Sequence, residues 1–371
     1  MSEISYIVVF PSIFSKNKIS QLMKNIKKIL QIKNQSFNSV KRDGDVILVD
    51  ANDPVFASSA ISLLFGIEKI AIARQTKNNF QEIVSEITSI GGNLLLKGEK
   101  FLVKVEGISK GFLTKDIEIA STSEIIEKKS NLGARPGTEE DHNKLLYTYL
   151  TKENAYVCIF MDKGMSGIPF TSHREKILCA IYDEISAISC FETIKQGYDI
   201  RIVVCYKGDN ELTYIAKMLN QILPRLVENK VKLDFFQIKM NPKGIKNYQK
   251  FLGMVIEILL TYQNRYVSLP ILPLMFSLEQ MEDIMNKIFE SKKIPIVPLA
   301  GTDTNLFEDA KEIGIERNFN KIEKLFTVKS VQFPDVLNKE LELIVNTKKT
   351  IDITMGPNNV HDILDSFEEN H

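Results

Sequence analysis

The second half of the chain alternates short apolar runs with longer segments of helical periodicity. The apolar runs are residues 177–181, 200–205, 233–238 and 294–298. The predicted helices are residues 188–195, 211–228, 244–263 and 278–291. Strands separated by helices of this length pair in parallel, with the helices crossing over the faces of the sheet. The pattern therefore predicts a doubly wound α/β domain built on a parallel sheet.

The first strand–helix–strand unit of this region contains the turn at which such folds commonly hold a nucleotide phosphate. It reads "ILCAIYDEISAISCFETIKQGYDIRIVV", and Gly197 ends its helix. The turn contains Tyr182, Asp183 and Glu184, without a glycine or a nearby lysine. The order of elements is typical of a nucleotide-binding protein, whereas the residues of the turn are not.

The N-terminal third predicts a smaller domain of ferredoxin-like type. Strands are expected at residues 5–12 and 46–49, and the lysine-rich segment 16–33 has its apolar residues on one helical face. A helix that ends at Gly66 and a following apolar strand complete a β-α-β-α-β order. This domain is expected to end near residue 75.

A second module is predicted between residues 76 and 169. It begins with a helix over residues 78–92 and continues with an alternating, half-buried strand over residues 100–107. A helix capped by Thr114, the polar stretch 131–144 and a strand–turn–strand unit follow. Near the C-terminus, "ELELIVNT" predicts a strand, and the acidic last residues are expected to fray.

Composition narrows the classes of function. The 47 basic and 47 acidic residues balance, although basic residues are in excess in the N-terminal third, where an anion such as RNA is expected to bind. The four cysteines form no CxxC pair, which predicts no metal site. We find no signal peptide, and the longest apolar run contains two prolines. We therefore expect no membrane span and a cytoplasmic, reducing location.

Local patterns along the chain resemble one family, the tRNA thiouridine synthetases, which are sulfurtransferases also linked to thiamine biosynthesis. "FLVKVEG" and "KDIEIASTSEII" resemble a strand and helix of a THUMP RNA-binding domain, and "GMSGIPF" resembles its junction with a PP-loop adenylating domain. "LPILPLMFSLEQMEDIMNKI" is similar to the proline-bearing strand and following helix of that PP-loop domain. The resemblance implies a ferredoxin-like domain at 1–75, a THUMP domain at 76–169, a PP-loop-like α/β domain (adenine nucleotide α-hydrolase-like) at 170–335 and a C-terminal extension at 336–371.

The chain departs from the family pattern at the nucleotide site. The family signature is SGGxDS, whose glycines let backbone N–H groups wrap the pyrophosphate of ATP, but the matching stretch here is "YDEISA". A carboxylate about 4 Å from a phosphate charge adds about 4 kcal/mol of repulsion at a protein surface. The resemblance thus implies a degenerate PP-loop without adenylation, and no cofactor is expected. If the site is remodelled instead, Tyr182, Glu184 and Ser186 are the candidate nucleotide-binding residues, with ATP and Mg²⁺ as cofactors.

The residues of sulfur transfer also differ from the family. The cysteine expected after "IPIVP" is replaced by "LAGTDTN". Sulfur relay needs a thiolate that accepts a persulfide. Cys205, at the end of the second strand of the α/β domain, is the remaining candidate, and Asp183 is the other candidate catalytic residue. The alternative for Cys205 is an ordinary buried cysteine.

In a THUMP-like module, lysine and arginine side chains contact the phosphates of tRNA and follow its shape rather than its sequence. The candidate RNA-binding residues are Lys97, Lys100, Lys104, Lys110, Lys115, Lys128, Lys129 and Arg135.

Three hypotheses follow from these patterns. The first is a cytoplasmic tRNA-binding member of the family whose α/β domain is a scaffold, with a homodimer or an active paralogue as a possible partner. The second is an active ATP-dependent tRNA sulfurtransferase with a remodelled site at Asp183, Ser186 and Cys205. The third is a nucleotide- or metabolite-binding protein that does not bind RNA.

Overall fold

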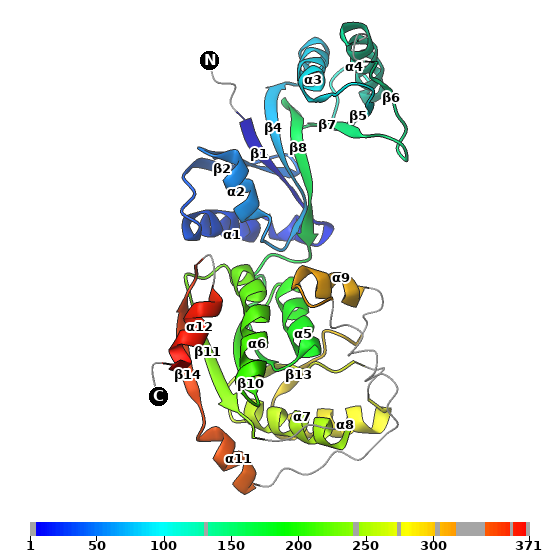
Figure 1. The fold of residues 1–371 in the computed structure, drawn as a ribbon. Coiled ribbons are helices and arrows are strands. Elements are labelled where there is room, and N and C mark those ends of the chain that lie inside the picture. The colour runs from blue at the N-terminus through cyan, green and yellow to red at the C-terminus, as the bar shows by residue number, and fades with distance from the viewer. Residues whose placement is uncertain are drawn as a thin grey trace. The chain divides into compact units, whose positions relative to one another are not determined.

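The computed structural model describes residues 5–129, 133–239, 245–272, 276–300, 305–316, 338–356 and 359–368. The chain forms two compact units, residues 1–167 (unit 1) and residues 168–371 (unit 2) (Figure 1). The predicted end of the third domain, residue 335, lies outside the described residues, as do the first two residues of the polar stretch 131–144. None of the described helices is long and apolar enough to cross a bilayer.

The first half of unit 1 has a ferredoxin-like arrangement. Its elements are β1 (Ser5–Pro11), η1 (Ile13–Lys18), α1 (Ile19–Ile32), β2 (Phe37–Asp43), β3 (Val46–Ala51), α2 (Pro54–Ile61) and β4 (Ile67–Lys77). The strands lie in the order β2-β3-β1-β4 and pair antiparallel, which is the β-α-β-β-α-β topology. The sequence prediction lacked β2, because "FNSVKRD" is polar and Val40 is its one buried residue.

The second half of unit 1 extends the same sheet. Its elements are α3 (Phe80–Leu94), β5 (Lys100–Gly107), α4 (Thr114–Lys128), β6 (Arg135–Pro136), β7 (Lys144–Leu150) and β8 (Asn154–Ser166). Long antiparallel pairing between β4 and β8 joins the halves, so the described strands form one eight-stranded sheet in the order β2-β3-β1-β4-β8-β7-β5-β6. Residue 75, the predicted end of the first domain, lies within β4.

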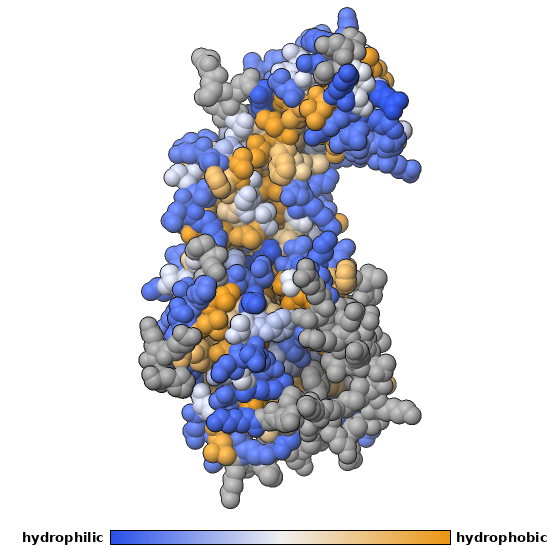
Figure 2. Space-filling view, in the orientation of Figure 1, coloured by the Kyte–Doolittle hydropathy of each residue, from blue (hydrophilic) through white to orange (hydrophobic). Residues whose placement is uncertain are grey.

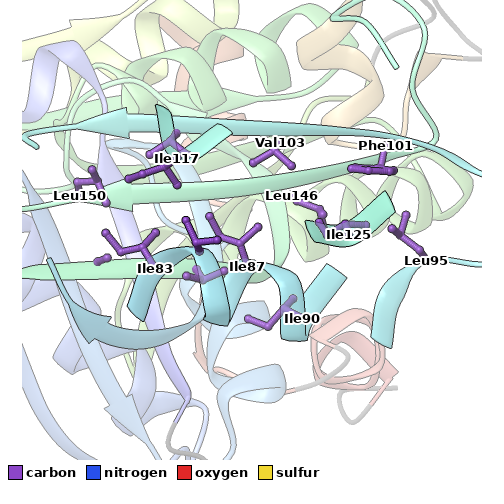
Figure 3. Packing of buried hydrophobic residues seen from close by; sticks show 14 of the residues in the cluster. Ile83, Ile87, Ile90, Leu95, Phe101, Val103, Ile117, Ile125, Leu146 and Leu150 are labelled. Carbon is purple, nitrogen blue, oxygen red and sulfur yellow. The ribbon is translucent and has the colours of Figure 1, made fainter. Parts of the chain in front are cut away.

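Helices α3 and α4 pack on the β5–β7–β8 part of this sheet and form its core (Figure 3). Ile83 and Ile87 of α3 and Ile117 of α4 are fully buried, and burying each such side chain stabilises the fold by about 1.5–3 kcal/mol. Asn79 caps α3 by accepting hydrogen bonds from two backbone N–H groups. The predicted cap of α4 at Thr114 is wrong: the helix begins at Thr114 and its N-cap is Leu113, whose backbone N–H donates to the Asp116 carboxylate (3.1 Å).

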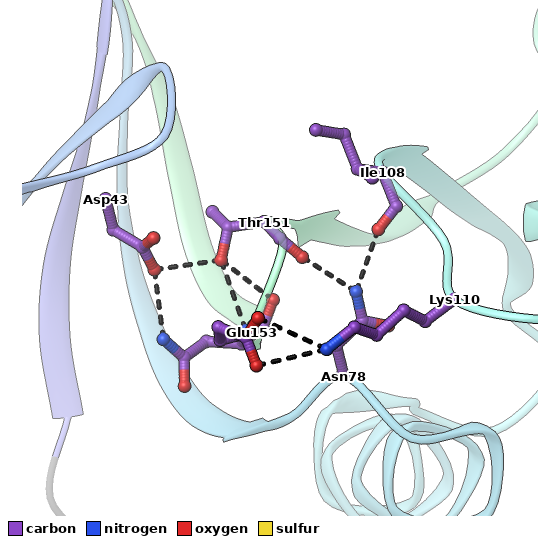
Figure 4. A network of polar contacts seen from close by, with 7 residues as sticks. Asp43, Asn78, Ile108, Lys110, Thr151 and Glu153 are labelled. Atoms are coloured by element: carbon purple, nitrogen blue, oxygen red, sulfur yellow. Dashed lines mark hydrogen bonds and ion pairs between the residues drawn. The ribbon is translucent and has the colours of Figure 1, made fainter.

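A polar network fastens the β7–β8 turn to the end of β2 (Figure 4). The Asp43 carboxylate accepts hydrogen bonds from Thr151 Oγ1 (2.8 Å) and Asn154 Nδ2 (3.0 Å), and also from the Tyr156 hydroxyl (2.5 Å). Burial alone would raise the pKa of Asp43, but these hydrogen bonds outweigh burial and hold the pKa below its usual range. Asn78 Nδ2 donates to the Thr151 carbonyl (2.7 Å) and so orders the other side of the turn.

Unit 2 is a doubly wound sheet with helices on both faces. Its elements are β9 (Lys176–Ile181), α5 (Glu184–Lys195), β10 (Asp199–Tyr206), α6 (Asp209–Ile222), η3 (Leu223–Leu226), β11 (Lys230–Gln237), α7 (Ile245–Leu260), β12 (Tyr266–Ser268), α8 (Leu278–Glu290), β13 (Ile294–Ile296), α9 (Asn305–Glu312), α11 (Asn338–Val345), β14 (Lys349–Thr354) and α12 (Asn359–Glu368). The described strands lie in the order β13-β12-β9-β10-β11-β14; β14 pairs antiparallel with β11, and the others pair in parallel. The predicted α/β fold class is confirmed.

Two predictions near the C-terminus are wrong. Most of the segment "ELELIVNT" belongs to helix α11 rather than to a strand, because its short apolar pattern fits both periodicities. The strand follows it, as β14, and its buried Ile351 and Ile353 alternate with exposed residues. Most of the tail expected to fray is helix α12, whose Phe367 packs edge-on against Phe235 of β11 (5.1 Å between ring centroids).

The order of the strands reverses between β9 and β12. From β9 the chain proceeds to β10 and β11 on one side, and β12 and β13 lie on the other side. In such sheets a crevice forms at the carboxyl ends of the two strands where the order reverses, and ligands bind there. The turn that follows β9, residues 182–186, therefore lies where a nucleotide would be expected.

Candidate functional site

The turn after β9 satisfies its own backbone groups. The Ser186 hydroxyl accepts hydrogen bonds from the backbone N–H groups of Tyr182 and Asp183 (both 2.9 Å) and donates to the Asp183 carbonyl (2.8 Å). In return, the Asp183 carboxylate accepts from the Ser186 N–H (2.8 Å) and caps helix α5. A phosphate-binding turn leaves such N–H groups free to face the anion. Here side-chain oxygens accept from the N–H groups of Tyr182 and Asp183, just before helix α5, and from the N–H group of Ser186 in its first turn.

The neighbours of this turn are also engaged. Tyr182 is 2% exposed, and its ring packs at a tilt against Phe251 (5.4 Å). Glu184 accepts a hydrogen bond from the Tyr214 hydroxyl (3.2 Å). Sequence reasoning missed Lys207, which follows β10 at the same edge of the sheet and lies 4.5 Å from the Phe251 ring centroid. Its position directly after a buried strand was the available signal.

Lys207 does not leave an unpaired positive charge at this edge. Its Nζ lies 3.0 Å from the Glu211 carboxylate, which also accepts a hydrogen bond from the Lys207 backbone N–H (2.7 Å). The charge that a phosphate would need at this edge is therefore already neutralised by a carboxylate one turn along α6.

The cysteines lie in the core. Cys205 is fully buried, and burial raises the pKa of its thiol well above the ordinary range. Cys190 is buried beside Cys179, and its pKa is raised mainly by burial. A thiolate is the nucleophilic form of cysteine, so a buried thiol with a raised pKa reacts slowly. Among the residues that the structure describes, no group of three or more His, Cys, Asp or Glu side chains is arranged to hold a metal ion.

Most of the predicted RNA-binding cations in unit 1 form ion pairs. The pairs are Lys100 with Asp141, Lys104 with Glu106 and Glu139, Lys110 with Glu153, Lys115 with Glu118, and Lys128 with Glu124. Lys97, Lys129 and Arg135 have no ion pair within the described ranges. Figure 2 shows hydrophilic residues prevailing around β5 and β6, where several of these cations lie. Exposed ion pairs contribute only about 0–1 kcal/mol, so a phosphate can displace the carboxylate.

Unit 1 also contains a groove that the sequence did not reveal, with a volume of about 280 Å³. Phe10, Tyr147 and Tyr149 form its aromatic wall; Phe10 lies edge-on to both tyrosines, with ring centroids 6.0 and 5.2 Å away. Its cations are Lys16, Arg42 and Lys69, and its carboxylates are Asp45, Glu68 and Glu106. These residues come from β1, β2, β4, β5, β7, the short helix η1 and the β2–β3 turn, so no local sequence motif contains them.

The three cations of the groove are matched by three carboxylates, and Lys69 is the cation beside its aromatic wall. Lys69 Nζ lies 5.3 Å from the Tyr147 ring centroid, and Lys69 sits directly opposite Lys163 in the β4–β8 pairing. Like charges at directly opposed positions destabilise a sheet. Lys163 does not line the groove, so an anion bound there would reduce this repulsion from the side of Lys69 alone.

Comparisons with known proteins agree with this architecture. No protein-family model matches the chain. It is 23% identical over 186 residues to a probable tRNA sulfurtransferase of Methanosarcina mazei, covering 50% of this chain and 46% of that protein. It is 23% identical over 210 residues to a probable tRNA sulfurtransferase of Thermococcus kodakarensis, covering 54% and 53%. The chain thus spans about half the length of the curated relatives it matches.

Two solved structures share the fold over most of the chain. One is a 4-thiouridine synthetase–RNA complex with bound ATP, with a TM-score of 0.65 and 16% identity, covering 94% of this chain and all of that one. The other is PH1313 from Pyrococcus horikoshii, with a TM-score of 0.63 and 17% identity, covering 84% of this chain and all of that one.

Proposed function

Because the chain is a relative of the tRNA sulfurtransferases, we propose that it is a cytoplasmic tRNA-binding protein that holds RNA through unit 1 and does not adenylate it. The observation that carries the second part is the turn after β9, where Ser186 and Asp183 bond the amides that ATP would need. The first part rests on the relatives and on the aromatic, cation-bearing groove of unit 1.

The groove suits an unpaired end or loop of RNA. Aromatic side chains stack on exposed bases, a contact worth about 1–3 kcal/mol for each base, and cations hold the adjoining phosphates. Tyr149 and Phe10 are partly exposed in the groove, whereas Tyr147 is buried and donates its hydroxyl to Glu106 (2.7 Å). Tyr149 and Phe10 are thus the stacking residues, and Lys69 is the nearest phosphate partner.

The energetics of the turn support the proposal that the protein does not adenylate RNA. Seating a polyphosphate there would break the three hydrogen bonds that Tyr182, Asp183 and Ser186 donate from their backbone N–H groups, each worth about 0.5–1.5 kcal/mol. The Asp183 carboxylate would add about 4 kcal/mol of repulsion at a separation of about 4 Å. Together these terms approach the roughly 8 kcal/mol of a micromolar affinity.

A remodelled sulfurtransferase that uses ATP and Mg²⁺ is the second candidate. It requires the turn to open so that Ser186 can face a nucleotide, and it requires Cys205 to leave the core. The third candidate is a metabolite-binding protein that does not bind RNA. For unit 2 we propose a scaffold role, in a homodimer or beside an active paralogue.

Calorimetric titration with tRNA and with ATP–Mg²⁺ separates the three candidates. We expect the protein to bind tRNA with an affinity that falls steeply as the salt concentration rises, and we expect no heat of binding when ATP–Mg²⁺ is added. ATP binding or thiolation of tRNA by the purified protein would favour the enzyme, and failure to bind tRNA would leave the metabolite-binding protein.

Variants then locate the RNA face. Lys69→Glu and Tyr149→Ala should each weaken tRNA binding about tenfold, and the double variant Lys100→Glu/Lys104→Glu tests the β5 face. Lys217→Glu, an exposed lysine on α6 in unit 2, makes the same charge change away from unit 1 and should leave the affinity unchanged. Equal losses in Lys69→Glu and Lys217→Glu would mean that net charge alone holds the RNA.

A further inference from the structure

A second hollow, in unit 2, has the chemistry of an anion site. Its volume is about 480 Å³, and it is lined by the segment that follows α7, by the first part of β10 and by the residue before β14. Its lining residues are Arg201, Thr261, Tyr262, Gln263, Asn264 and Lys348. None of these six is acidic. Two are cations, and both lie close to the same ring: Arg201 Cζ is 4.8 Å and Lys348 Nζ is 5.0 Å from the Tyr262 ring centroid.

The buried carboxylate of Asp234 holds Arg201, Tyr262 and Lys348 in position. Asp234 has a side chain that is 1% exposed, and it accepts hydrogen bonds from Arg201 (2.7 Å) and from the Tyr262 hydroxyl (2.9 Å). Thr350 Oγ1 donates to its other oxygen (2.6 Å), and Lys348 Nζ lies 3.6 Å away. Burial raises the pKa of Asp234, but the hydrogen bonds from Thr350, Tyr262 and Arg201 outweigh burial and hold the pKa below its usual range. Asp234 therefore stays ionised.

The charges within this cluster do not cancel. Asp234 supplies one negative charge against the two positive charges of Arg201 and Lys348, so one positive charge remains at the hollow. The neighbouring Asp199 on β10 is already paired with Lys176 (3.1 Å). In addition, Arg201 Nε is buried and has no hydrogen-bond partner. A buried donor without a partner costs about 1–3 kcal/mol, so Asp234 does not use all the hydrogen-bonding capacity of this guanidinium group.

The rim of the hollow is held in place. Lys293 is 7% exposed, and its Nζ donates to the backbone carbonyls of Tyr262 and Asn264 at the end of α7. Asn264 Nδ2 donates to the Lys176 carbonyl (3.2 Å). A rim that is already ordered loses little conformational entropy when a ligand binds. The exposed side chain of Gln263 remains as a further donor for an anion.

We propose that this hollow binds a phosphate group between Arg201 and Lys348, against the ring of Tyr262. The site lies away from the turn after β9 and does not depend on the proposed RNA binding by unit 1. The phosphate can belong to an RNA backbone or to a small phosphorylated molecule, since both present the same tetrahedral oxygens to a guanidinium and an ammonium group.

The test uses the full chain labelled with 3-fluorotyrosine, with inorganic phosphate as the probe. The ¹⁹F signal of Tyr262 is assigned by its absence in Tyr262→Phe. We expect a saturable shift of that signal on adding phosphate at constant ionic strength, and no shift with chloride alone. Lys348→Gln should weaken phosphate binding about tenfold or more, because it removes a charged hydrogen-bond donor and leaves Asp234 three partners.

Lys232→Gln is the matched control. Lys232 is exposed on β11, directly opposite Asp352 in the pairing with β14, and does not line the hollow. Its variant should bind phosphate as the parent does. A missing shift at Tyr262, or equal affinity in Lys348→Gln and the parent with both folded, overturns the proposal. Adding tRNA identifies the source: displacement of phosphate from Tyr262 assigns the site to RNA, and retention assigns it to a small phosphorylated molecule.

Discussion

Replacing Ser186 by alanine tests whether its hydroxyl stabilises the turn after β9 or is a contact for a nucleotide. The Ser186 hydroxyl is fully buried, accepts two backbone N–H groups and donates to one carbonyl. Removing it leaves buried donors without a partner, which costs about 1–3 kcal/mol for each donor, and weakens the capped start of α5. Because some of these groups will find water, we expect the free energy of unfolding of unit 2 to fall by about 2–4 kcal/mol.

The assay is urea unfolding followed by pulsed hydrogen exchange, with peptides from unit 2 read separately from those of unit 1. With a slope of about 2–3 kcal/mol per molar urea, the midpoint of unit 2 should fall by about 1 M. Thr213→Ala is the control: its hydroxyl donates to the Asp209 carbonyl (3.0 Å) on the exposed side of α6, and its loss should change stability by less than about 0.5 kcal/mol.

A different result would refute the reasoning about the turn. If Ser186→Ala unfolds at the same urea concentration as the parent, the hydroxyl does not hold the turn together. If, in addition, the parent binds ATP and the variant does not, Ser186 is a nucleotide contact and the remodelled enzyme becomes the better account.

Three further predictions concern stability. Burial and the nearby Glu192 raise the pKa of Asp309 to about 7, although the ion pair with Lys195 (2.9 Å) acts in the opposite direction. The stability that protonated Asp309 contributes is therefore complete below about pH 4 and is lost as the pH rises through 7. Asp309→Asn should reduce this pH dependence in unfolding measured from about pH 4 to 8. Gly107 has a φ of 107°, and alanine in that conformation costs roughly 1–3 kcal/mol. Gly107→Ala should destabilise unit 1 by more than this cost, because the new Cβ would also lie 2.1 Å from the Leu150 carbonyl oxygen. Gly98→Ala is the control: Gly98 has a φ of 77° and open space around it, so its variant should show only the cost of the backbone conformation. Ile87→Ala should destabilise unit 1 by about 2–5 kcal/mol in urea, against little change for the 58%-exposed Ile119→Ala; similar losses in both would mean that Ile87 does not belong to a close-packed core.

The fold was predictable where a local pattern decides the structure. The apolar runs of unit 2 became β9, β10 and β11 within a few residues of their predicted bounds, because strands buried on both faces are continuously apolar. Elements were missed where the hydrophobic pattern is weak or fits both a helix and a strand. The polar edge strand β2 carries little hydrophobic signal, and α11 has a short run that fits a helix as well as a strand.

The sites were less predictable, because their residues converge only in three dimensions. The residues of the turn after β9 were identified from sequence, since they are consecutive, but their mutual hydrogen bonds depend on rotamers that the sequence does not reveal. The carboxylates that pair with Lys100 and Lys104 could not be identified from sequence either, because Asp141 and Glu139 lie 41 and 35 residues further along the chain. The groove of unit 1 and the hollow of unit 2 have no local motif at all.

The turn and the hollow of unit 2 differ in where their polar groups are directed. At residues 182–186 the backbone N–H groups of Tyr182, Asp183 and Ser186 are hydrogen-bonded to side chains of the same turn, so an anion would have to displace these side chains before it could bind the N–H groups. Around Asp234 the cations exceed the carboxylate by one, and the buried Arg201 Nε still lacks an acceptor. An anion there would meet one positive charge that Asp234 does not neutralise. The balance of charge and hydrogen bonds therefore favours phosphate binding at the face near Tyr262 over binding at the turn after β9.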